Sequence, residues 1–207
     1  MPSKNQFKSA QKWFIENCEY LGPVVKEIGP VKLDLHPGTF EVLVSSIVSQ
    51  QLSIKAAQTI HQRLVSLVDG DVNPKRLAAL QAEEYQRCGI SRQKQGYMYD
   101  LAARFIAEPE LYIALDKLDD AEVIKRLVMI KGIGVWTAQM YLIFSLGRPD
   151  VFPVDDLGVR LGMQRVFGWK EIPGKSELIE VSIRWSPYRS AASWYLWRYL
   201  ELSRKSK

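Results

Sequence analysis

A pair of aspartates is the part of this sequence whose residue types could most directly do chemistry. Asp155 and Asp156 stand together in "DVFPVDDLGV", directly before a segment of helical periodicity. Aspartate is a favoured helix N-cap, and a carboxylate facing a cleft can stabilise a developing positive charge or orient a water molecule. We expect one aspartate to cap the helix and the other to point into a cleft.

A glycine-flanked turn lies about twenty residues before the aspartates, in "LVMIKGIGVWTAQM". This segment ends one helical pattern, passes through Lys131–Gly134 and starts a second pattern at Val135. Glycine permits a positive φ and a close approach of another backbone, and the free N–H groups of a helix N-terminus bind phosphate. The pattern predicts a helix–hairpin–helix that grips a nucleic-acid backbone independently of base sequence. The alternative is a close helix turn without a ligand.

Composition and charge narrow the class of protein. The 207-residue chain has a net charge of +5 and a pI near 9.1, which favours a polyanionic partner. Cys18 and Cys88 have no partner at metal-ligand spacing, and His36 and His61 each stand alone. We therefore expect no metal and no cofactor. Hairpin carbonyls can bind a monovalent cation, although nothing in the sequence requires one.

The apolar segments are short. The longest run, "VWTAQMYLIFSL", cannot span a bilayer, and the first residues lack the apolar stretch of a secretion signal. We expect no membrane partner and an intracellular location, which the low cysteine content also favours. We also expect a monomer.

Helical periodicity dominates the chain, and no convincing pair of strand patterns is found. We predict an all-α fold with about ten helices. Within the first helical stretch, which runs to Gly29, a break is expected at Gly22-Pro23 because proline resists the interior of a helix.

Cap signals predict several helix ends. Ser53 is expected to cap a helix that follows the polar junction 49–52, and Ser91 to cap another. In the last helical segment, Ser186 fits the N-cap and Pro187 the first turn.

Four motifs together resemble the helix–hairpin–helix DNA glycosylases, and most of all the 3-methyladenine DNA glycosylase II (AlkA) family. They are "IVSQQLSIKAA", "LVMIKGIGVWTAQMYLIF", "DVFPVDDLGV" and "RWSPYRSAASWYLW", and they occur in this order over most of the chain. The resemblance implies two helical lobes with the active-site cleft between them. We expect lobe one at about 39–155, including the hairpin 127–146, and lobe two at about 1–38 plus 156–207. The β-sheet domain that some members carry before this core is not expected.

The resemblance assigns roles residue by residue. It places the catalytic aspartate at Asp156, with Asp155 as the neighbouring cap. The remaining implied positions are the base-pocket residues Trp136, Tyr188, Met140 and Leu157, the DNA wedge Gln51 and Leu52, and the DNA-backbone contacts Lys131, Gly132, Gly134 and Thr137. Two departures concern the pocket, because Met140 and Leu157 stand where relatives can have tyrosines. A third is Lys131, which replaces a common proline and is expected to contact phosphate.

The implied activity is the hydrolysis of the N-glycosidic bond of alkylated purines in duplex DNA. Such bases carry a positive charge, which aromatic faces such as Trp136 and Tyr188 can hold, and the base must first rotate out of the duplex. Relatives that also cut the strand have a lysine where Trp136 stands, so no lyase activity is expected. Relatives that protonate normal adenine have a glutamate where Ser46 stands.

Two other functions remain open from the sequence. One is a glycosylase for deaminated or oxidised bases. The other is a non-catalytic DNA-binding module that uses the hairpin alone, for which Asp156→Asn would leave all function intact.

Overall fold

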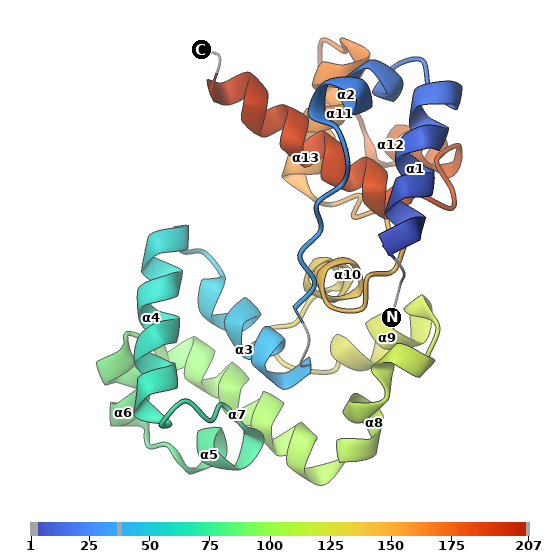
Figure 1. The fold of residues 1–207 in the computed structure, drawn as a ribbon. Helices are drawn as coiled ribbons and strands as arrows, with labels where there is room; N and C mark the ends of the chain where they lie inside the picture. Colours follow the sequence, from blue (N-terminus) through green and yellow to red (C-terminus); the bar gives the residue numbers. More distant parts are fainter. Residues whose placement is uncertain (1–3, 37–38, 206–207) are drawn as a thin grey trace. The chain divides into compact units, whose positions relative to one another are not determined.

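All of the regular secondary structure in the described residues is helical. The computed structural model describes residues 4–36 and 39–205, and every regular element in those ranges is helical (Figure 1). The predicted all-α fold is confirmed. The described residues form thirteen α-helices and one short 3-10 helix, more than the ten or so expected. None of these helices has both the length and the apolar character needed to cross a membrane.

The chain divides into two compact units. One comprises residues 36–141 and is called here the hairpin unit; the other comprises residues 1–35 and 142–207 and is called the aspartate unit. The first boundary lies close to the expected one near residue 38. The second differs from the expected end of lobe one at 155, because the residues after Tyr141 pack with the C-terminal helix. The predicted cleft between the lobes stays a prediction.

The hairpin unit is arranged around one long helix, α7, which contacts α3, α5, α6 and α8. Its buried residues include Leu43, Leu64, Tyr85 and Met98, each completely shielded from solvent. The helices are α3 (Thr39–Ser49), α4 (Ile54–Leu67), α5 (Pro74–Ala79), α6 (Ala82–Cys88), α7 (Arg92–Ala107), α8 (Pro109–Ile113), the 3-10 helix Leu115–Lys117, α9 (Asp120–Leu127) and α10 (Val135–Phe144), which runs past the unit boundary.

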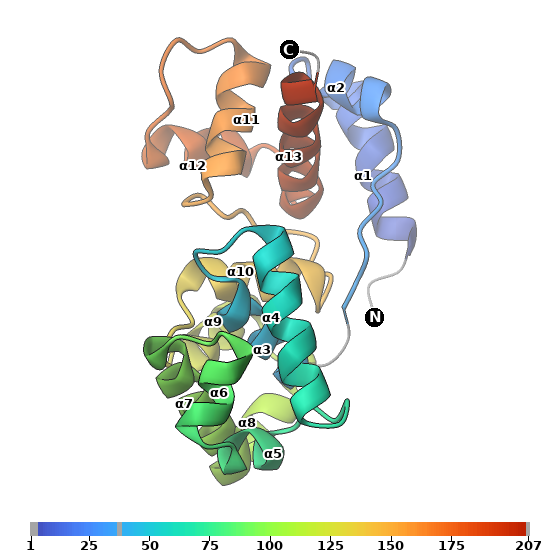
Figure 2. The ribbon, with the colours of Figure 1, turned by 90° about the vertical axis from the view of Figure 1, so that its left-hand side faces the viewer.

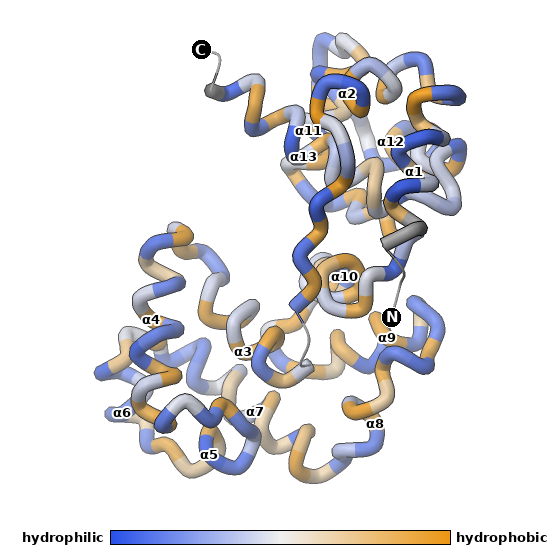
Figure 3. The backbone as a smooth tube through the Cα atoms, in the orientation of Figure 1, coloured by the Kyte–Doolittle hydropathy of each residue, from blue (hydrophilic) through white to orange (hydrophobic). Residues whose placement is uncertain are grey.

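The aspartate unit is built on the C-terminal helix. Figure 2 shows α13 between α11 on one side and α1 with α2 on the other, and α13 contacts all three. Along α13 hydrophobic and hydrophilic residues alternate in short stretches (Figure 3), so one face packs on the core. Phe14, Trp185 and Tyr195 lie in that core. The helices are α1 (Lys4–Asn17), α2 (Leu21–Ile28), α11 (Leu157–Phe167), α12 (Lys175–Ile183) and α13 (Arg189–Lys205).

The segment after α10 is fastened to the start of α13, which explains the position of the unit boundary. The Val151 N–H donates to Ser190 Oγ at 2.9 Å, and the Ser190 hydroxyl donates to the Arg148 carbonyl at 2.6 Å. The Arg189 guanidinium donates to Asp150 Oδ1 at 2.7 Å. Burial alone would raise the pKa of Asp150, but its bonds from Arg189 and Ser186 outweigh that effect and lower it.

Two of the predicted caps are confirmed by their hydrogen bonds. Ser53 Oγ accepts from the Ala56 N–H at the start of α4, and Ser91 Oγ accepts from the Lys94 N–H at the start of α7. Each hydroxyl satisfies one of the N–H groups that a helix start leaves without an intrahelical partner.

Two other predicted boundaries are wrong. The first helical stretch breaks at residues 18–20, and Gly22 and Pro23 lie inside the first turn of α2, where the missing proline N–H costs nothing. A Cβ on Gly22 would lie 2.9 Å from the Phe14 carbonyl oxygen, so this glycine permits the close approach of α1 and α2. At the other end of the chain α13 begins only at Arg189, because the Ser186 hydroxyl donates to Asp150 instead of capping a helix.

Candidate functional site

Asp156 is the N-cap of α11, directly before the first helical residue. Its Oδ1 accepts the Val159 N–H at 2.8 Å, which is the N-cap bond of this helix. We expected Asp155 to be the cap, and that prediction is wrong. Asp155 is exposed and its carboxylate pairs with Lys175 at the start of α12. The cap therefore belongs to the aspartate that the resemblance makes catalytic, and its carboxylate is partly shielded.

A second donor reaches the same oxygen from α13. Trp197 Nε1 donates to Asp156 Oδ1 at 2.8 Å. The sequence did not single out Trp197, because one tryptophan in a helix rich in aromatics looks like core packing. Its only signal was its place at the end of the last family motif.

The predicted pocket residues of the aspartate unit are Tyr188 and Leu157. Tyr188 is half-buried, and its ring centroid lies 5.8 Å from that of Trp13 and 6.5 Å from that of Phe14. Leu157, the residue after Asp156, is 59 % exposed, which leaves its side chain available to a ligand. The Tyr188 ring is thus packed against two aromatic rings and is still partly exposed to solvent.

The other two predicted pocket residues lie in the hairpin unit. Trp136 is in the first turn of α10 and is 46 % exposed, which is unusual for the largest apolar side chain. Met140 lies one turn later and is half-buried. A single pocket formed by these residues with Tyr188 and Leu157 stays a prediction.

The hairpin has the backbone geometry that the sequence predicts. Between α9 and α10, Gly132 has a φ of +82° and Ile133 is buried at 3 % exposure. A Cβ on Gly132 would lie 2.3 Å from Cδ2 of the Tyr97 ring, so only glycine fits there. A Cβ on Gly134 would meet nothing within 4 Å, so its exposed backbone is open to a ligand at the positive end of α10.

The other predicted backbone contacts differ in exposure. Lys131 is exposed, and its ammonium group lies 3.9 Å from Asp100 Oδ1. Thr137 is only 7 % exposed, so its side chain belongs to the packed face of α10. Any contribution of Thr137 to DNA binding would come from its place in the first turn of the helix.

Asp100 on α7 supports the hairpin turn from behind. Its Oδ2 accepts the Lys131 backbone N–H at 2.9 Å and the Arg104 Nε–H at 2.9 Å. Burial alone would raise the pKa of Asp100, but the bonds from Lys131 and Arg104 outweigh it, so the pKa is lowered. The carboxylate thus fixes the first residue of the turn.

The predicted wedge lies in the turn between α3 and α4. Gln51 is exposed and has a φ of +57°, a left-handed conformation that a residue with a side chain rarely adopts. Leu52 beside it is 40 % exposed, and Ile54 at the start of α4 is 80 % exposed. A strained turn that presents a polar tip and two apolar side chains suits insertion into a base stack.

Two side chains connect the wedge turn to its surroundings. Gln50 Nε2 donates to the Gly132 carbonyl at 2.7 Å, which joins the wedge turn directly to the hairpin. The Lys94 ammonium on α7 donates to the carbonyls of Val48 and Gln50, both at 2.7 Å. Burial lowers the pKa of Lys94. The wedge and the hairpin are therefore parts of one hydrogen-bonded assembly.

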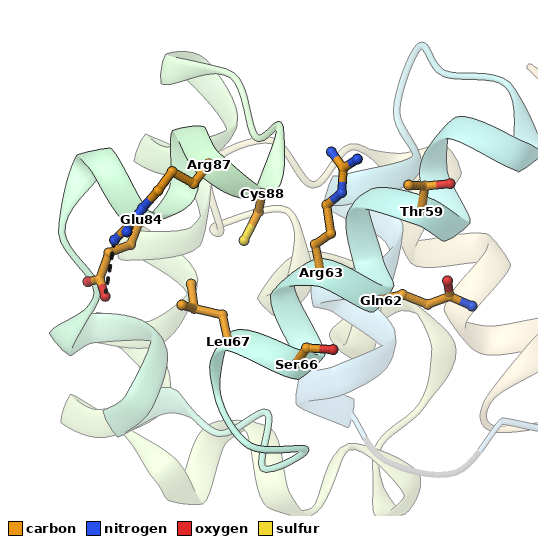
Figure 4. A pocket seen from close by; sticks show the side chains of 8 residues that line it. All are labelled: Thr59, Gln62, Arg63, Ser66, Leu67, Glu84, Arg87 and Cys88. Carbon is orange, nitrogen blue, oxygen red and sulfur yellow. Dashed lines mark ion pairs between the residues drawn. The ribbon is translucent and has the colours of Figure 1, made fainter.

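A separate groove of about 640 Å³ lies between α4 and α6, and none of the predicted site residues lines it (Figure 4). Arg63 and Arg87 border it, and Arg87 pairs with Glu84 at 3.9 Å. Burial raises the pKa of the Cys88 thiol on its wall, although both arginines oppose the effect. In the ranges that the structure describes, no group of three or more His, Cys, Asp or Glu side chains could hold a metal ion.

Comparison with known proteins agrees with the helix–hairpin–helix geometry. Residues 44–187 match the family described as HhH-GPD superfamily base excision DNA repair protein. The chain is 35 % identical over 196 residues to the DNA-3-methyladenine glycosylase 1 of Schizosaccharomyces pombe. The alignment covers 93 % of this chain and 86 % of that protein.

Two solved structures have a closely similar fold. The S. pombe 3-methyladenine DNA glycosylase (Mag1) in complex with abasic DNA has a TM-score of 0.84 at 33 % identity, covering 94 % of this chain and 98 % of that one. The DNA-3-methyladenine glycosidase of Bacillus halodurans also has a TM-score of 0.84, at 36 % identity, covering 94 % of this chain and 91 % of that one. The chain belongs to the HhH-GPD superfamily of base excision DNA repair proteins.

Proposed function

We propose that this protein is a monofunctional DNA glycosylase that hydrolyses the N-glycosidic bond of alkylated purines in duplex DNA and so starts base excision repair. The observation that carries the proposal is the Asp156 carboxylate, anchored at the start of α11 by two hydrogen bonds in a chain of this superfamily. The relatives named for 3-methyladenine support the class of base, and the relative bound to abasic DNA supports DNA as the partner.

The chemistry suits a carboxylate that does not have to protonate the base. A purine methylated at N3 or N7 already carries a positive charge, so the electrons of the breaking C1′–N bond neutralise it as it leaves. Positive charge grows on the sugar, and Asp156 stabilises that charge and orients the water that attacks C1′. The water oxygen bonds to C1′, its proton is released to solvent or to the carboxylate, and an abasic site with an unbroken strand remains.

The base pocket is proposed to hold the cationic base by its aromatic faces. Trp136 and Tyr188 are the partners for cation–π contact, worth about 0.5–2 kcal/mol each. Met140 and Leu157 complete the pocket with apolar surface. No lysine stands at the position of Trp136 to form a Schiff base, so the enzyme does not cleave the strand.

The hairpin is proposed to bind the DNA backbone, and the wedge is proposed to enter the duplex where the base leaves. The N–H groups around Gly134 and the Lys131 ammonium contact phosphates, which is binding without sequence preference. Gln51 and Leu52 fill the space that the flipped base leaves in the stack. The protein acts as an intracellular monomer.

The test is base release from duplex DNA treated with a methylating agent, with the released bases separated by chromatography. We expect the wild type to release 3-methyladenine and 7-methylguanine and to leave unbroken abasic strands. Asp156→Asn should lower the rate about 10²–10⁴-fold and leave DNA affinity almost unchanged. Preferential release of hypoxanthine or an oxidised base would show that the substrates are deaminated or oxidised bases. DNA binding without release of any base would show that the protein is a non-catalytic DNA-binding module.

A further inference from the structure

The indole N–H of Trp197 donates a hydrogen bond to the carboxylate of Asp156, and a glycine beside both groups leaves the space for this contact. The donor on α13 lies 2.8 Å from Oδ1, the same oxygen that takes the N-cap bond from Val159. Two donors on one oxygen, one from the backbone of α11 and one from the side of α13, restrict both rotation and tilt of the carboxylate. Hydrogen bonds to a charged acceptor are about twice as strong as neutral ones.

Gly158 is the reason that the two groups can touch. A Cβ at this position would lie 2.8 Å from Trp197 Cδ1, too close for a Cβ contact, and 3.0 Å from Asp156 Oδ1, which is also tight. One turn later, a Cβ on Gly162 would lie 2.8 Å from the Leu196 carbonyl oxygen. The glycine face of α11 thus lets α13 come close enough for the indole to reach the carboxylate.

The plane of the indole is fixed by a ring neighbour. Phe144 stacks on Trp197 with ring centroids 5.7 Å apart and an interplanar angle of 27°. A half-buried tryptophan usually finds an acceptor for its N–H group, and core packing alone would be satisfied by any acceptor. Here the acceptor is the carboxylate on which the proposed chemistry depends, and electrostatic stabilisation requires a charge that is oriented before the reaction begins.

We propose that Trp197 is a positioning residue for the glycosylase reaction: its N–H group holds the Asp156 carboxylate in the orientation that stabilises the sugar cation, and Gly158 supplies the space. This inference rests on the proposed function, in which Asp156 is the catalytic carboxylate. Trp197 acts through Asp156 and is not assigned any contact with the base.

Trp197→Phe is the direct test, because phenylalanine removes the N–H donor and keeps a smaller aromatic ring next to Phe144. Three quantities are measured on the full chain: the single-turnover rate of methylpurine release from methylated duplex, the Kd for an abasic duplex, and the melting temperature. We expect the rate to fall about tenfold or more, with the Kd unchanged within about twofold. The melting temperature is expected to change by only a few degrees.

Two further variants make the result specific. Trp194→Phe is the matched control, because Trp194 is on the same helix and its indole contacts Tyr195 and Arg198; its rate should equal that of the wild type. Gly158→Ala separates the indole from the carboxylate while keeping both residues, so it should lower the rate in the same way.

The outcomes are distinguishable. A Trp197→Phe rate equal to the wild-type rate overturns the proposal, and so does a rate loss matched by equal losses of DNA affinity and melting temperature, which indicates packing alone. A wild type that releases no methylated base refutes the proposed function, and this inference with it. A fully active Asp156→Asn removes the catalytic assignment, so that Trp197 has no catalytic group to position.

Discussion

The aspartate site and the hairpin differ in which part of the chain is held in place. At the aspartate site hydrogen bonds orient a side chain, whereas at the hairpin side chains orient the backbone. The Asp156 carboxylate is the proposed functional group, and hydrogen bonds from a backbone N–H and an indole hold it. At the hairpin the groups proposed to bind DNA are backbone N–H groups, and hydrogen bonds from Asp100 and Gln50 hold the backbone of the turn. The rate of base release should therefore depend on Asp156 and the groups that orient its side chain, and DNA affinity on the backbone shape of the hairpin and the groups that maintain it.

The largest effect on the hairpin is expected from a substitution at Gly132. Gly132→Ala forces a left-handed φ on a residue with a Cβ and places that Cβ 2.3 Å from the Tyr97 ring. We expect a loss of about 3 kcal/mol or more in the free energy of unfolding and a marked loss of DNA affinity. Urea unfolding and fluorescence anisotropy with an abasic duplex measure the two effects.

Gly134→Ala is the matched control for this substitution. The added Cβ meets no protein atom within 4 Å, so stability should stay within about 0.5 kcal/mol of the wild type. Affinity should still fall, because the methyl group occupies the space next to the phosphate. Equal stability losses in the two variants would contradict the account of the turn.

Asp100→Asn tests whether a partly buried carboxylate maintains the conformation of the hairpin turn. It removes the charge that pairs with Arg104 and accepts the Lys131 N–H, and we expect a loss of about 2 kcal/mol at pH 7. Because the folded state lowers the pKa of Asp100, its stabilisation is present above about pH 4 and is lost as the pH falls through the lowered value.

The pH dependence makes this prediction specific. The difference in unfolding free energy between wild type and Asp100→Asn should shrink between pH 5 and pH 2. A difference that stays constant over this range would mean that the carboxylate contributes through packing or a neutral hydrogen bond. Urea unfolding at several pH values makes the measurement.

Lys94→Met should loosen the wedge with a smaller effect. The ammonium group holds the carbonyls of Val48 and Gln50, and these can be hydrated when it is removed because the region is only partly buried. We expect a loss of about 1 kcal/mol and slower base release with little change in DNA affinity. Release from a single-stranded substrate, which needs no wedge, should not slow; if it slows equally, Lys94 supports the fold and not base flipping.

The sequence predicted the parts of the site that depend on local pattern. The glycine turn, the buried Ile133 and the Ser53 cap depend on residues within a few positions, so periodicity and cap chemistry were enough. Support from distant residues was not predicted: Trp197 is 41 positions from Asp156, and Gln50 is 82 positions from Gly132. Nothing in local pattern specifies such pairs, because they arise only when helices pack.

The choice between the two aspartates failed for a related reason. Either Asp155 or Asp156 could cap the helix by propensity, and we interpreted Asp155 as the cap because the resemblance made Asp156 catalytic. In the structure the cap is Asp156, the residue proposed to be catalytic, and Asp155 pairs with Lys175 instead. A catalytic carboxylate that is also the N-cap starts with its orientation fixed by the helix.

Asp155→Asn is expected to have the smallest effect, and it tests whether Asp155 shares the role proposed for Asp156. Its pair with Lys175 is exposed on both sides, with 52 % and 61 % of the side chains accessible, and exposed ion pairs contribute about 0–1 kcal/mol. The rate of methylpurine release should stay within about twofold of the wild type, and added salt should remove any stability difference. A rate loss comparable to that of Asp156→Asn would mean that the two carboxylates act as a pair, and that the assignment of the chemistry to Asp156 alone is wrong.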